Sequence, residues 1–335
     1  MKILITGGTG FLGRHLVWRF AGEGAEVVFT GRCFDAADTV CKLSPRPVHW
    51  RPIEHGTREA PNQLQACAEG ATAIVHCAAL SSPWGRPADF RRANIDSTVE
   101  VLAACLTAGV ERLVHISTPS IYFDFQDRLA IREDSPLPKP VNEYARSKAE
   151  AERIILQETP VATVILRPRA LFGPWDETLM PRLLRVMRQG PIPLLRGGRA
   201  QVDLTYVDNV VDAVWLALNK SLPRRVATYN VSNGEPIELA TLLDMVAKTF
   251  ELPLRTRALP WSLIKGFAGL LETAAALTGA EPALTRYSAG VLAFSQTLDI
   301  GAISRDLGYF PKVSLEEGIR RHAQWWLARQ AGSTP

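Results

Sequence analysis

Short apolar runs and helix-like segments alternate along the first half of the chain. Lys2–Thr6 is apolar and ends at glycines, and Phe11–Phe20 carries apolar residues at helical spacing. Further apolar runs predict strands at Glu26–Thr30, Ala73–Cys77, Arg112–Ser117 and Val161–Leu166. Helix-like segments lie at Phe90–Ala108 and Glu143–Gln157. This alternation predicts an α/β fold, a doubly wound parallel sheet covered by helices on both faces.

The pattern changes after residue 166. Prolines and glycines between residues 174 and 198 interrupt the chain, which predicts the start of a smaller substrate-binding lobe. Val226–Val231 predicts one more strand, so the chain should return to the sheet. We therefore expect a dinucleotide-binding domain at residues 1–166, to which residues 202–232 return. The substrate lobe should consist of residues 167–201 and 233–330.

A helical stripe of apolar residues lies at Trp261–Leu277, with Lys265 and Glu272 on its other face. The segment is short for a bilayer and its charges would be costly there, so we expect no integral membrane span. Three interpretations stay open: core packing, a lid over an apolar substrate, and a peripheral membrane contact.

The composition is that of a packed globular enzyme, with 47% hydrophobic and 21% charged residues among 335. The net charge of +4 is spread along the chain without a long basic run, so we expect no nucleic-acid partner. The five cysteines lack metal-ligand spacing, and no signal peptide precedes the first apolar run. These features predict a cytoplasmic protein without a metal site.

One local concentration of positive charge stands out. Arg182, Arg185 and Arg188 would share a face if their segment is helical. Such a row is either a solvated helix face or a site that captures an anionic substrate tail.

A glycine turn follows the first predicted strand. Gly7, Gly10 and Gly13 form a G-x-x-G-x-x-G spacing that opens the first helix. Glycine lets the backbone approach a ligand closely, and the helix N-terminus offers free N–H groups to a pyrophosphate. In this context the turn predicts a dinucleotide site of the Rossmann type.

The end of the second predicted strand decides which dinucleotide is favoured. An acidic residue there would bind the adenosine ribose of NAD, but the chain has Thr30-Gly31-Arg32. A guanidinium can pair with a 2′-phosphate, so NADP(H) is favoured over NAD(H). Asp35 would still allow NAD if it folded back to the ribose.

Tyr144 and Lys148 form an i, i+4 pair on one predicted helix face, after a strand that ends at Ser117-Thr118. A free phenol has a pKa of about 10, and a nearby ammonium would favour its phenolate. We expect Tyr144 to exchange the proton on a substrate oxygen that Thr118 also holds, while hydride passes to or from nicotinamide.

These features together resemble the extended short-chain dehydrogenases/reductases, the NAD-dependent epimerase/dehydratase superfamily. The resemblance extends over nearly the whole chain. Further matching segments are His76-Cys77-Ala78-Ala79, Asn94–Thr98, Ser117–Tyr122, Arg167–Pro174 and Tyr206–Val210. Trp84-Gly85 and Ser232–Pro236 are similar to the 3β-hydroxysteroid dehydrogenase-like branch, and particularly to bacterial 2-alkyl-3-oxoalkanoate reductases. Phe123 stands where the family commonly has glycine, which predicts a reshaped pocket.

The resemblance implies the roles of individual residues. Thr118 would complete a triad with Tyr144 and Lys148, and Asn94 would support the lysine through water, although Asn94 also fits a helix cap. The residues expected to hold the dinucleotide are Gly7, Thr9, Gly10, Phe11, Leu12, Gly13, Arg32, Ala78, Ala79, Ser117, Tyr144, Lys148 and Pro168. The branch implies reduction of a ketone, or oxidation of the alcohol, on a bulky apolar substrate. Helices Phe90–Ala108 and Glu143–Gln157 would pair in a homodimer.

Two other functions compete with this interpretation. A nucleotide-sugar epimerase or dehydratase would use the same fold and the same Tyr/Lys pair with NAD. Arg182, Arg185 and Arg199 favour it, whereas Arg32 and the apolar 261–277 segment do not. A non-catalytic NADP sensor would retain the fold without needing the Thr118, Tyr144 and Lys148 set.

Overall fold

A seven-stranded parallel sheet forms the centre of the computed structural model, which describes residues 1–331. Its strand order is β12-β7-β5-β4-β1-β2-β3. The strands are β1 (Lys2–Thr6), β2 (Glu26–Thr30), β3 (His49–Arg51), β4 (Ala73–His76), β5 (Arg112–Ile116), β7 (Ala162–Pro168) and β12 (Val226–Val231). The order reverses between β1 and β4, so the predicted doubly wound topology is confirmed.

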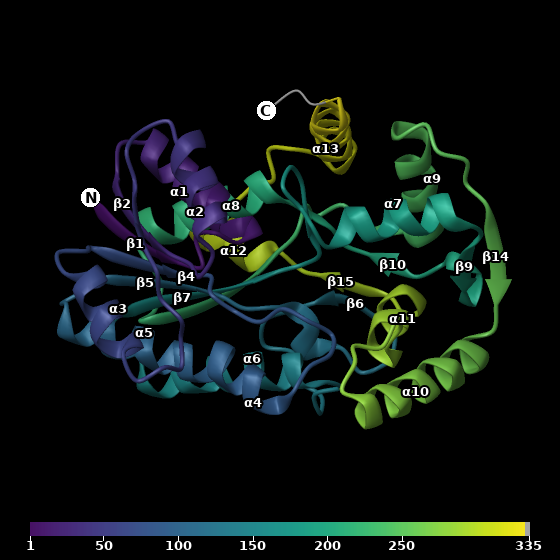
Figure 1. The fold of residues 1–335 in the computed structure, drawn as a ribbon, viewed down its shortest axis with the longest axis horizontal. Helices are drawn as coiled ribbons and strands as arrows, with labels where there is room; N and C mark the ends of the chain where they lie inside the picture. The colour runs from purple at the N-terminus through teal and green to yellow at the C-terminus, as the bar shows by residue number, and fades with distance from the viewer. Residues whose placement is uncertain (332–335) are drawn as a thin grey trace.

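Helices cover both faces of this sheet (Figure 1). One face carries α1 (Phe11–Gly22), α2 (Phe34–Leu43), α8 (Val207–Asn219) and α12 (Gly301–Leu307). The other face carries α3 (Ala60–Ala68), α5 (Ser97–Thr107) and α6 (Glu143–Glu158). Apart from the edge strand β3, the strands are mostly apolar because their side chains enter a packed layer on either side.

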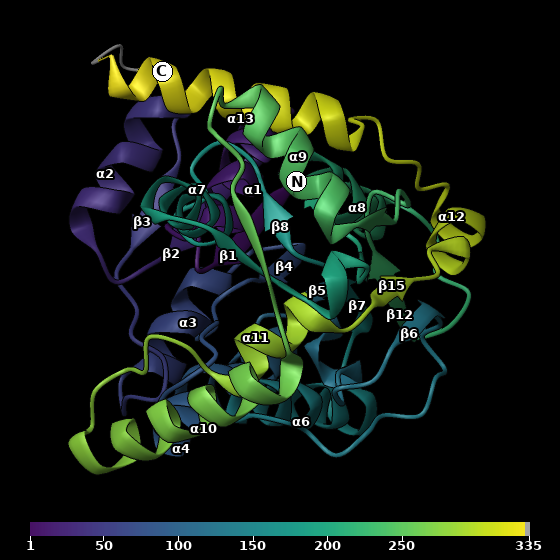
Figure 2. The same cartoon turned by 90° about the vertical axis from the view of Figure 1, so that its right-hand side faces the viewer.

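The second lobe is built around three small sheets, from segments after β7 together with the earlier strand β6. Their orders are β13-β10-β15-β6, β11-β8 and β14-β9. The strands are β6 (Arg128–Ile131), β8 (Leu171–Phe172), β9 (Ile192–Leu195), β10 (Gln201–Val202), β11 (Thr205–Tyr206), β13 (Ile237–Glu238), β14 (Thr256–Leu259) and β15 (Gln296–Leu298). The helices are α7 (Leu179–Gln189), α9 (Leu239–Thr249), α10 (Trp261–Thr278), α11 (Arg286–Ala293) and α13 (Leu315–Gln330). Helix α13 packs against α9 and runs along one edge of the molecule (Figure 2).

The predicted helix Phe90–Ala108 is wrong as a single element. It consists of α4 (Pro87–Phe90), a π-helical turn at Arg91–Asp96 and then α5. A π-turn inserts a residue into the ladder without interrupting the apolar pattern, so periodicity cannot reveal it. The turn carries Asn94 into the interior.

The core interpretation of the 261–277 segment is also wrong. Only Ala268 and Ala275 of α10 are buried, whereas Leu270 is 73% and Leu277 is 85% exposed. Within residues 1–331 no helix is both long and apolar enough to cross a membrane, and no cluster of side chains suits a metal ion. All five cysteines are free.

Candidate active site

The glycine turn between β1 and α1 forms a cradle with no room for side chains. A Cβ on Gly7, whose φ is +68°, would lie 2.8 Å from the backbone of Ala78, and one on Gly13 would lie 2.1 Å from the Gly7 carbonyl oxygen. Arg14 makes the first helical hydrogen bond, to Gly10. The N–H groups of Phe11, Leu12 and Gly13 therefore precede the helical ladder and are free to bind an anion. These features fit a dinucleotide pyrophosphate.

The adenosine side of this cradle lies at the end of β2. A Cβ on Gly31 would lie 2.4 Å from the hydroxyl oxygen of Thr9, so Gly31 keeps the two loops together. Arg32 follows with an exposed side chain. Asp35 is also exposed, in the first turn of α2. The position of Arg32 at the rim suits a 2′-phosphate.

The end of β4 faces the glycine turn. The Thr6 hydroxyl accepts a hydrogen bond from the Ala78 N–H at 3.2 Å and also contacts Nδ1 of His76 at 2.7 Å. Ala78 is half-buried and Ala79 is exposed. Small side chains at these two positions leave the space above the turn open.

Tyr144 lies in the first turn of α6 and is half-buried, with its ring 6.5 Å from that of Phe90. Burial raises the pKa of its phenol, while hydrogen bonds with Ser81 and Thr118 act in the opposite direction. Lys148 is not among the groups that shift this pKa; its ammonium bonds to Ile116 and His115 instead. At neutral pH the Tyr144 phenol therefore carries its proton.

Lys148 is 2% exposed, one turn after Tyr144 on α6. Its ammonium donates to the Ile116 carbonyl at 2.7 Å and to Nε2 of His115 at 3.0 Å. Burial lowers the pKa of Lys148 to about 8, and the charge of Glu152 opposes this. Burial also holds the pKa of His115 well below its usual range, so the imidazole is neutral and can accept this hydrogen bond.

Thr118 and a side chain from the second lobe share one hydrogen-bonded chain. The Thr118 hydroxyl donates to the Ser120 hydroxyl at 2.9 Å, and Ser120 lies 2.7 Å from the hydroxyl of Tyr287 on α11. The predicted triad residues Thr118, Tyr144 and Lys148 thus lie together at the carboxyl end of β5. Tyr287 adds a group from the other lobe.

Ser117 and Pro168 end neighbouring strands. The Ser117 hydroxyl donates to Glu152, so only its backbone is available to a dinucleotide. Glu152 is also paired with Arg167, in a salt bridge whose two side chains are at most 5% exposed. Pro168 is buried and ends β7. This buried pair fixes α6, which carries Tyr144 and Lys148, against the sheet.

Asn94 is 1% exposed, and both the oxygen and the nitrogen of its side-chain amide form hydrogen bonds. Its oxygen accepts from the Leu80 N–H at 2.7 Å, and its nitrogen donates to the Leu80 carbonyl and to the Ser147 hydroxyl. The helix-cap interpretation is wrong, because Asn94 lies inside the π-turn. It ties the β4–α4 loop to α6 immediately before Lys148.

Sequence reasoning missed Ser81, His115 and Tyr287. His115 lies inside an apolar strand, where a histidine is usually a core residue, and Tyr287 lies 139 positions beyond Lys148. Only the position of His115 two residues before the Ser117-Thr118 strand end was a usable signal.

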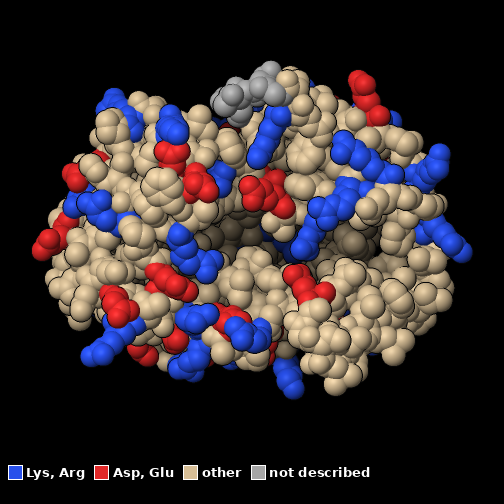
Figure 3. All heavy atoms as spheres, in the orientation of Figure 1, with Lys and Arg blue, Asp and Glu red and all other residues tan. Residues whose placement is uncertain are grey.

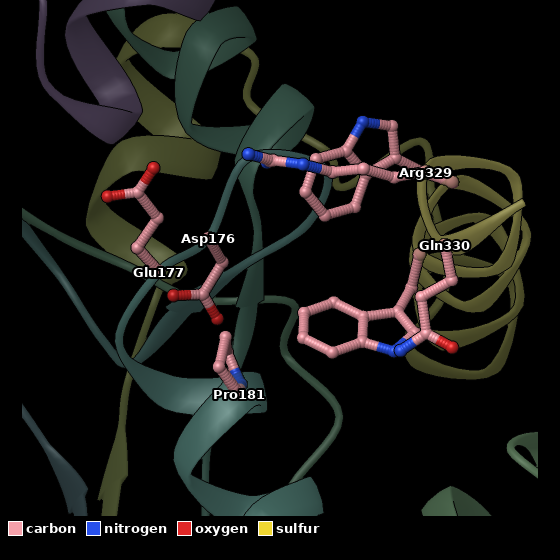
Figure 4. Close-up of a pocket in the computed structure, with 7 residues that line it drawn as sticks. Asp176, Glu177, Pro181, Arg329 and Gln330 are labelled. Carbon is pink, nitrogen blue, oxygen red and sulfur yellow. The ribbon is translucent and has the colours of Figure 1, made fainter. Parts of the chain in front are cut away.

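The surface is hollowed between the two lobes, near the carboxyl ends of the central strands (Figure 3). A separate pocket of about 430 Å³ lies between the β8–α7 loop and α13, with Asp176, Trp325 and Arg329 among its lining residues (Figure 4). None of the predicted site residues lines that pocket. Arg182, Arg185 and Arg188 are exposed on α7, as a shared helix face predicts.

Comparison with known families decides the relationship. Residues 3–232 match the NAD dependent epimerase/dehydratase family. The chain belongs to this family. As an extended short-chain dehydrogenase/reductase it is an NAD(P)-dependent oxidoreductase.

Several relatives of this extended short-chain dehydrogenase are similar over nearly their full length. The chain is 35% identical to the uncharacterized protein YbjS of Escherichia coli, with 100% of both chains covered. It is 32% identical to a 2-alkyl-3-oxoalkanoate reductase of Stenotrophomonas maltophilia, covering 96% of this chain and 98% of the relative. It is 30% identical to the yeast sterol-4-alpha-carboxylate 3-dehydrogenase of Saccharomyces cerevisiae, covering 97% of each.

A solved structure agrees with the fold. The dTDP-glucose 4,6-dehydratase DesIV of Streptomyces venezuelae, with NAD bound, superposes with a TM-score of 0.77 at 25% identity, covering 99% of this chain and 98% of that one. The Rossmann-type architecture of this family is therefore present in full.

Proposed function

We propose that this enzyme uses NADPH to reduce a ketone on a bulky apolar substrate, such as a 2-alkyl-3-oxoalkanoate or a sterol-like molecule. The observation that carries the proposal is the cluster of Tyr144, Thr118 and Lys148 at the sheet edge next to the glycine turn. A nicotinamide dinucleotide supplies the hydride when bound.

The protonation of the site suits the direction of reduction. A ketone that accepts hydride must also gain a proton on its oxygen, and the neutral phenol of Tyr144 is positioned to give it. Thr118 orients the same oxygen through its hydroxyl. The buried ammonium of Lys148 compensates the phenolate that remains and offers its third N–H to the dinucleotide ribose.

The preference for NADPH rests on Arg32. Its exposed guanidinium follows Gly31, where NAD enzymes place a carboxylate on the ribose hydroxyls. A bidentate contact with a 2′-phosphate would favour NADPH.

The apolar substrate is supported by the relatives. Their names specify a 2-alkyl-3-oxoalkanoate and a sterol carboxylate, both large and mostly hydrocarbon. The half-buried ring of Tyr287 packs edge-on against the buried ring of Phe123, 5.5 Å away, close to the Tyr144 cluster. The part of the Tyr287 ring that stays accessible offers apolar surface to a hydrocarbon chain.

The deciding experiment compares Tyr144→Phe with the unchanged enzyme on a 2-alkyl-3-oxoalkanoate, following the loss of NADPH absorbance. We expect kcat to fall by about 10²- to 10⁴-fold, the usual contribution of a general acid. Tyr229→Phe is the matched control, since the Tyr229 hydroxyl donates to Asp306 of α12. Its activity should stay within about threefold, because one partly exposed hydrogen bond is lost.

The rival nucleotide-sugar function has its own test. The same preparations are assayed with UDP-glucose and NAD, and binding of UDP-glucose is measured by calorimetry. Tight UDP-glucose binding with no ketone reduction would replace the proposal by an epimerase or dehydratase. Unchanged turnover in Tyr144→Phe would instead favour a sensor.

A further inference from the structure

Arg169 is a buried cation that the proposed mechanism does not use. It lies one residue beyond the end of β7, at the sheet edge where β5 delivers Thr118. Its side chain is 8% exposed, and Nε has no hydrogen-bond partner. Its guanidinium forms no salt bridge with any residue of the described chain, 1–331. A guanidinium cannot give up its charge at physiological pH, so this cation is desolvated without a counter-ion.

The charge of Asp203 acts on Arg169, but the two side chains form no salt bridge within residues 1–331. Asp203 is 1% exposed; one of its carboxylate oxygens accepts the Leu298 N–H at 2.7 Å, and the other has no partner. Burial raises the pKa of Asp203 to about 6, against the smaller effect of Arg169. Asp203 is therefore mostly ionised at neutral pH, but it is not paired with the Arg169 guanidinium, whose Nε–H remains available to an anionic ligand.

Arg169 and the catalytic tyrosine share a neighbour. Tyr287 is within electrostatic range of both the Arg169 guanidinium and the Tyr144 phenol. Its hydroxyl continues the chain through Ser120 to Thr118. The anion site thus adjoins the position where the ketone oxygen must lie.

Tyr287 is held in a defined position. Its ring packs edge-on against Phe123 at an interplanar angle of 89°. A capping box of Thr285 and Ser288 fixes the first turn of α11, which carries Tyr287. Arg169 itself is anchored through its backbone, which bonds to Val231 and Thr205. The distance between proton donor and cation is therefore set by ordered elements.

We infer that Arg169 binds the carboxylate of a 3-oxo acid while Tyr144 and Thr118 hold its ketone oxygen. In a 3-oxo acid the carboxylate carbon is only two bonds from the ketone carbon, so both groups must fit within one small polar region. A guanidinium matches a carboxylate with two parallel hydrogen bonds. Arg169 then determines specificity: it selects the free acid over esters and simple ketones.

The chemistry balances without a further reactant. NADPH gives a hydride to C3, Tyr144 gives a proton to the C3 oxygen, and the product is the 3-hydroxy acid. The carboxylate is unchanged throughout and Arg169 transfers no proton. This inference rests on the proposed ketone reduction for its substrate, but the anion site is measurable apart from turnover.

The kinetic test compares a 2-alkyl-3-oxoalkanoate with its methyl ester. For Arg169→Met we expect kcat/KM to fall about 100-fold with the acid, because a bidentate charged contact is lost, and to change less than about threefold with the ester. Arg132→Met, an exposed arginine paired with Asp134, is the control and should leave both values unchanged. Equal losses with acid and ester, or no loss with either, would overturn the inference.

A binding test separates this inference from the proposed function. Decanoate and methyl decanoate are titrated by calorimetry into the enzyme with NADP⁺ bound. We expect decanoate to bind at least about tenfold more tightly, and Arg169→Met to abolish the difference. A wild-type enzyme that reduces neither ketone but shows this preference would refute the proposed function alone. Reduction of both ketones without any preference would refute the Arg169 assignment alone.

A second substitution at Arg169 tests the same site if the first does not fold. If Arg169→Met fails to fold, Arg169→Lys retains a charge but loses the paired geometry, and it should reduce kcat/KM for the acid about tenfold while sparing the ester. If neither variant folds, the affinity of the unchanged enzyme for decanoate relative to methyl decanoate still tests the carboxylate site. If the unchanged enzyme binds UDP-glucose tightly and Arg169→Met abolishes this binding, Arg169 binds a phosphate. That result would overturn the carboxylate site.

Discussion

The buried pair of Arg167 and Glu152 makes a measurable contribution to both stability and the site. Glu152 is 2% exposed and accepts from Nε of Arg167 at 2.9 Å, from a second guanidinium nitrogen and from Ser117. Arg167 also contacts the Tyr122 hydroxyl and ring. Removing the Arg167 guanidinium leaves the Glu152 carboxylate buried, with the Ser117 hydroxyl as its remaining hydrogen-bond donor.

The expected cost of Arg167→Met follows from this geometry. Breaking a buried pair by removing one partner costs about 3–5 kcal/mol, because the remaining charge is desolvated and uncompensated. For 335 residues the unfolding entropy is about 0.7 kcal/mol per kelvin, at about 2.1 cal/mol/K per residue. The melting midpoint should therefore fall by about 4–7 °C.

The assay is thermal unfolding followed by circular dichroism at neutral pH, with two comparison variants. Arg153 lies on α6, the helix that carries Glu152; it is 52% exposed and pairs with Glu150. Arg153→Met should therefore lower the free energy of unfolding by less than about 0.5 kcal/mol. Arg167→Met combined with Glu152→Met removes both charges and should be more stable than Arg167→Met alone. A double variant no more stable than the single one would refute the reasoning, and so would equal losses in Arg153→Met and Arg167→Met.

Two predictions concern the cofactor and the pH dependence. Arg32→Ala should lower kcat/KM for NADPH about tenfold, because one exposed charged contact is lost, and should change kcat/KM for NADH by less than about threefold. Steady-state kinetics with both dinucleotides measures these values. Equal effects on both dinucleotides would contradict the role of Arg32. The pKa of Lys148 lies near 8 in the folded chain and at 10.5 when unperturbed, because burial disfavours its charge. The ammonium is thus lost as pH rises through about 8, so kcat/KM for ketone reduction should decline above that pH. By linkage, the unfolded chain binds more protons between about pH 8 and 10.5, so this group makes stability increase with pH in that window. A pH–rate profile that is flat up to the titration of Tyr144, whose pKa is raised, would show that the lysine charge is not required.

Local sequence patterns predicted six of the seven strands of the central sheet and missed the short, polar edge strand β3. The strands β1 and β2 match their predicted bounds, and β4, β5 and β7 differ from prediction by one or two residues. Strands buried on both faces are continuous apolar runs, and this signal is contained in five or six neighbouring residues. The π-turn before α5 has no such local signal and was missed.

The candidate catalytic cluster was likewise predictable from the sequence only in part. Tyr144 and Lys148 are neighbours on one helix turn, so their spacing in the sequence already places them together. The directions of their pKa shifts depend on burial and on what the ammonium contacts, which are Ile116 and His115. Sequence spacing contains neither quantity.

The sequence by itself determined the doubly wound fold, the glycine turn and the placement of Tyr144 and Lys148 on one helix face, because each depends on residues within a few positions of one another. Only the tertiary structure decided that Tyr287 joins Thr118, and that Arg169 is buried without a counter-ion beside them. These groups come from separate segments and both lobes. Their proximity and charge depend on how the lobes pack, since burial and electrostatic environment are properties of the folded chain.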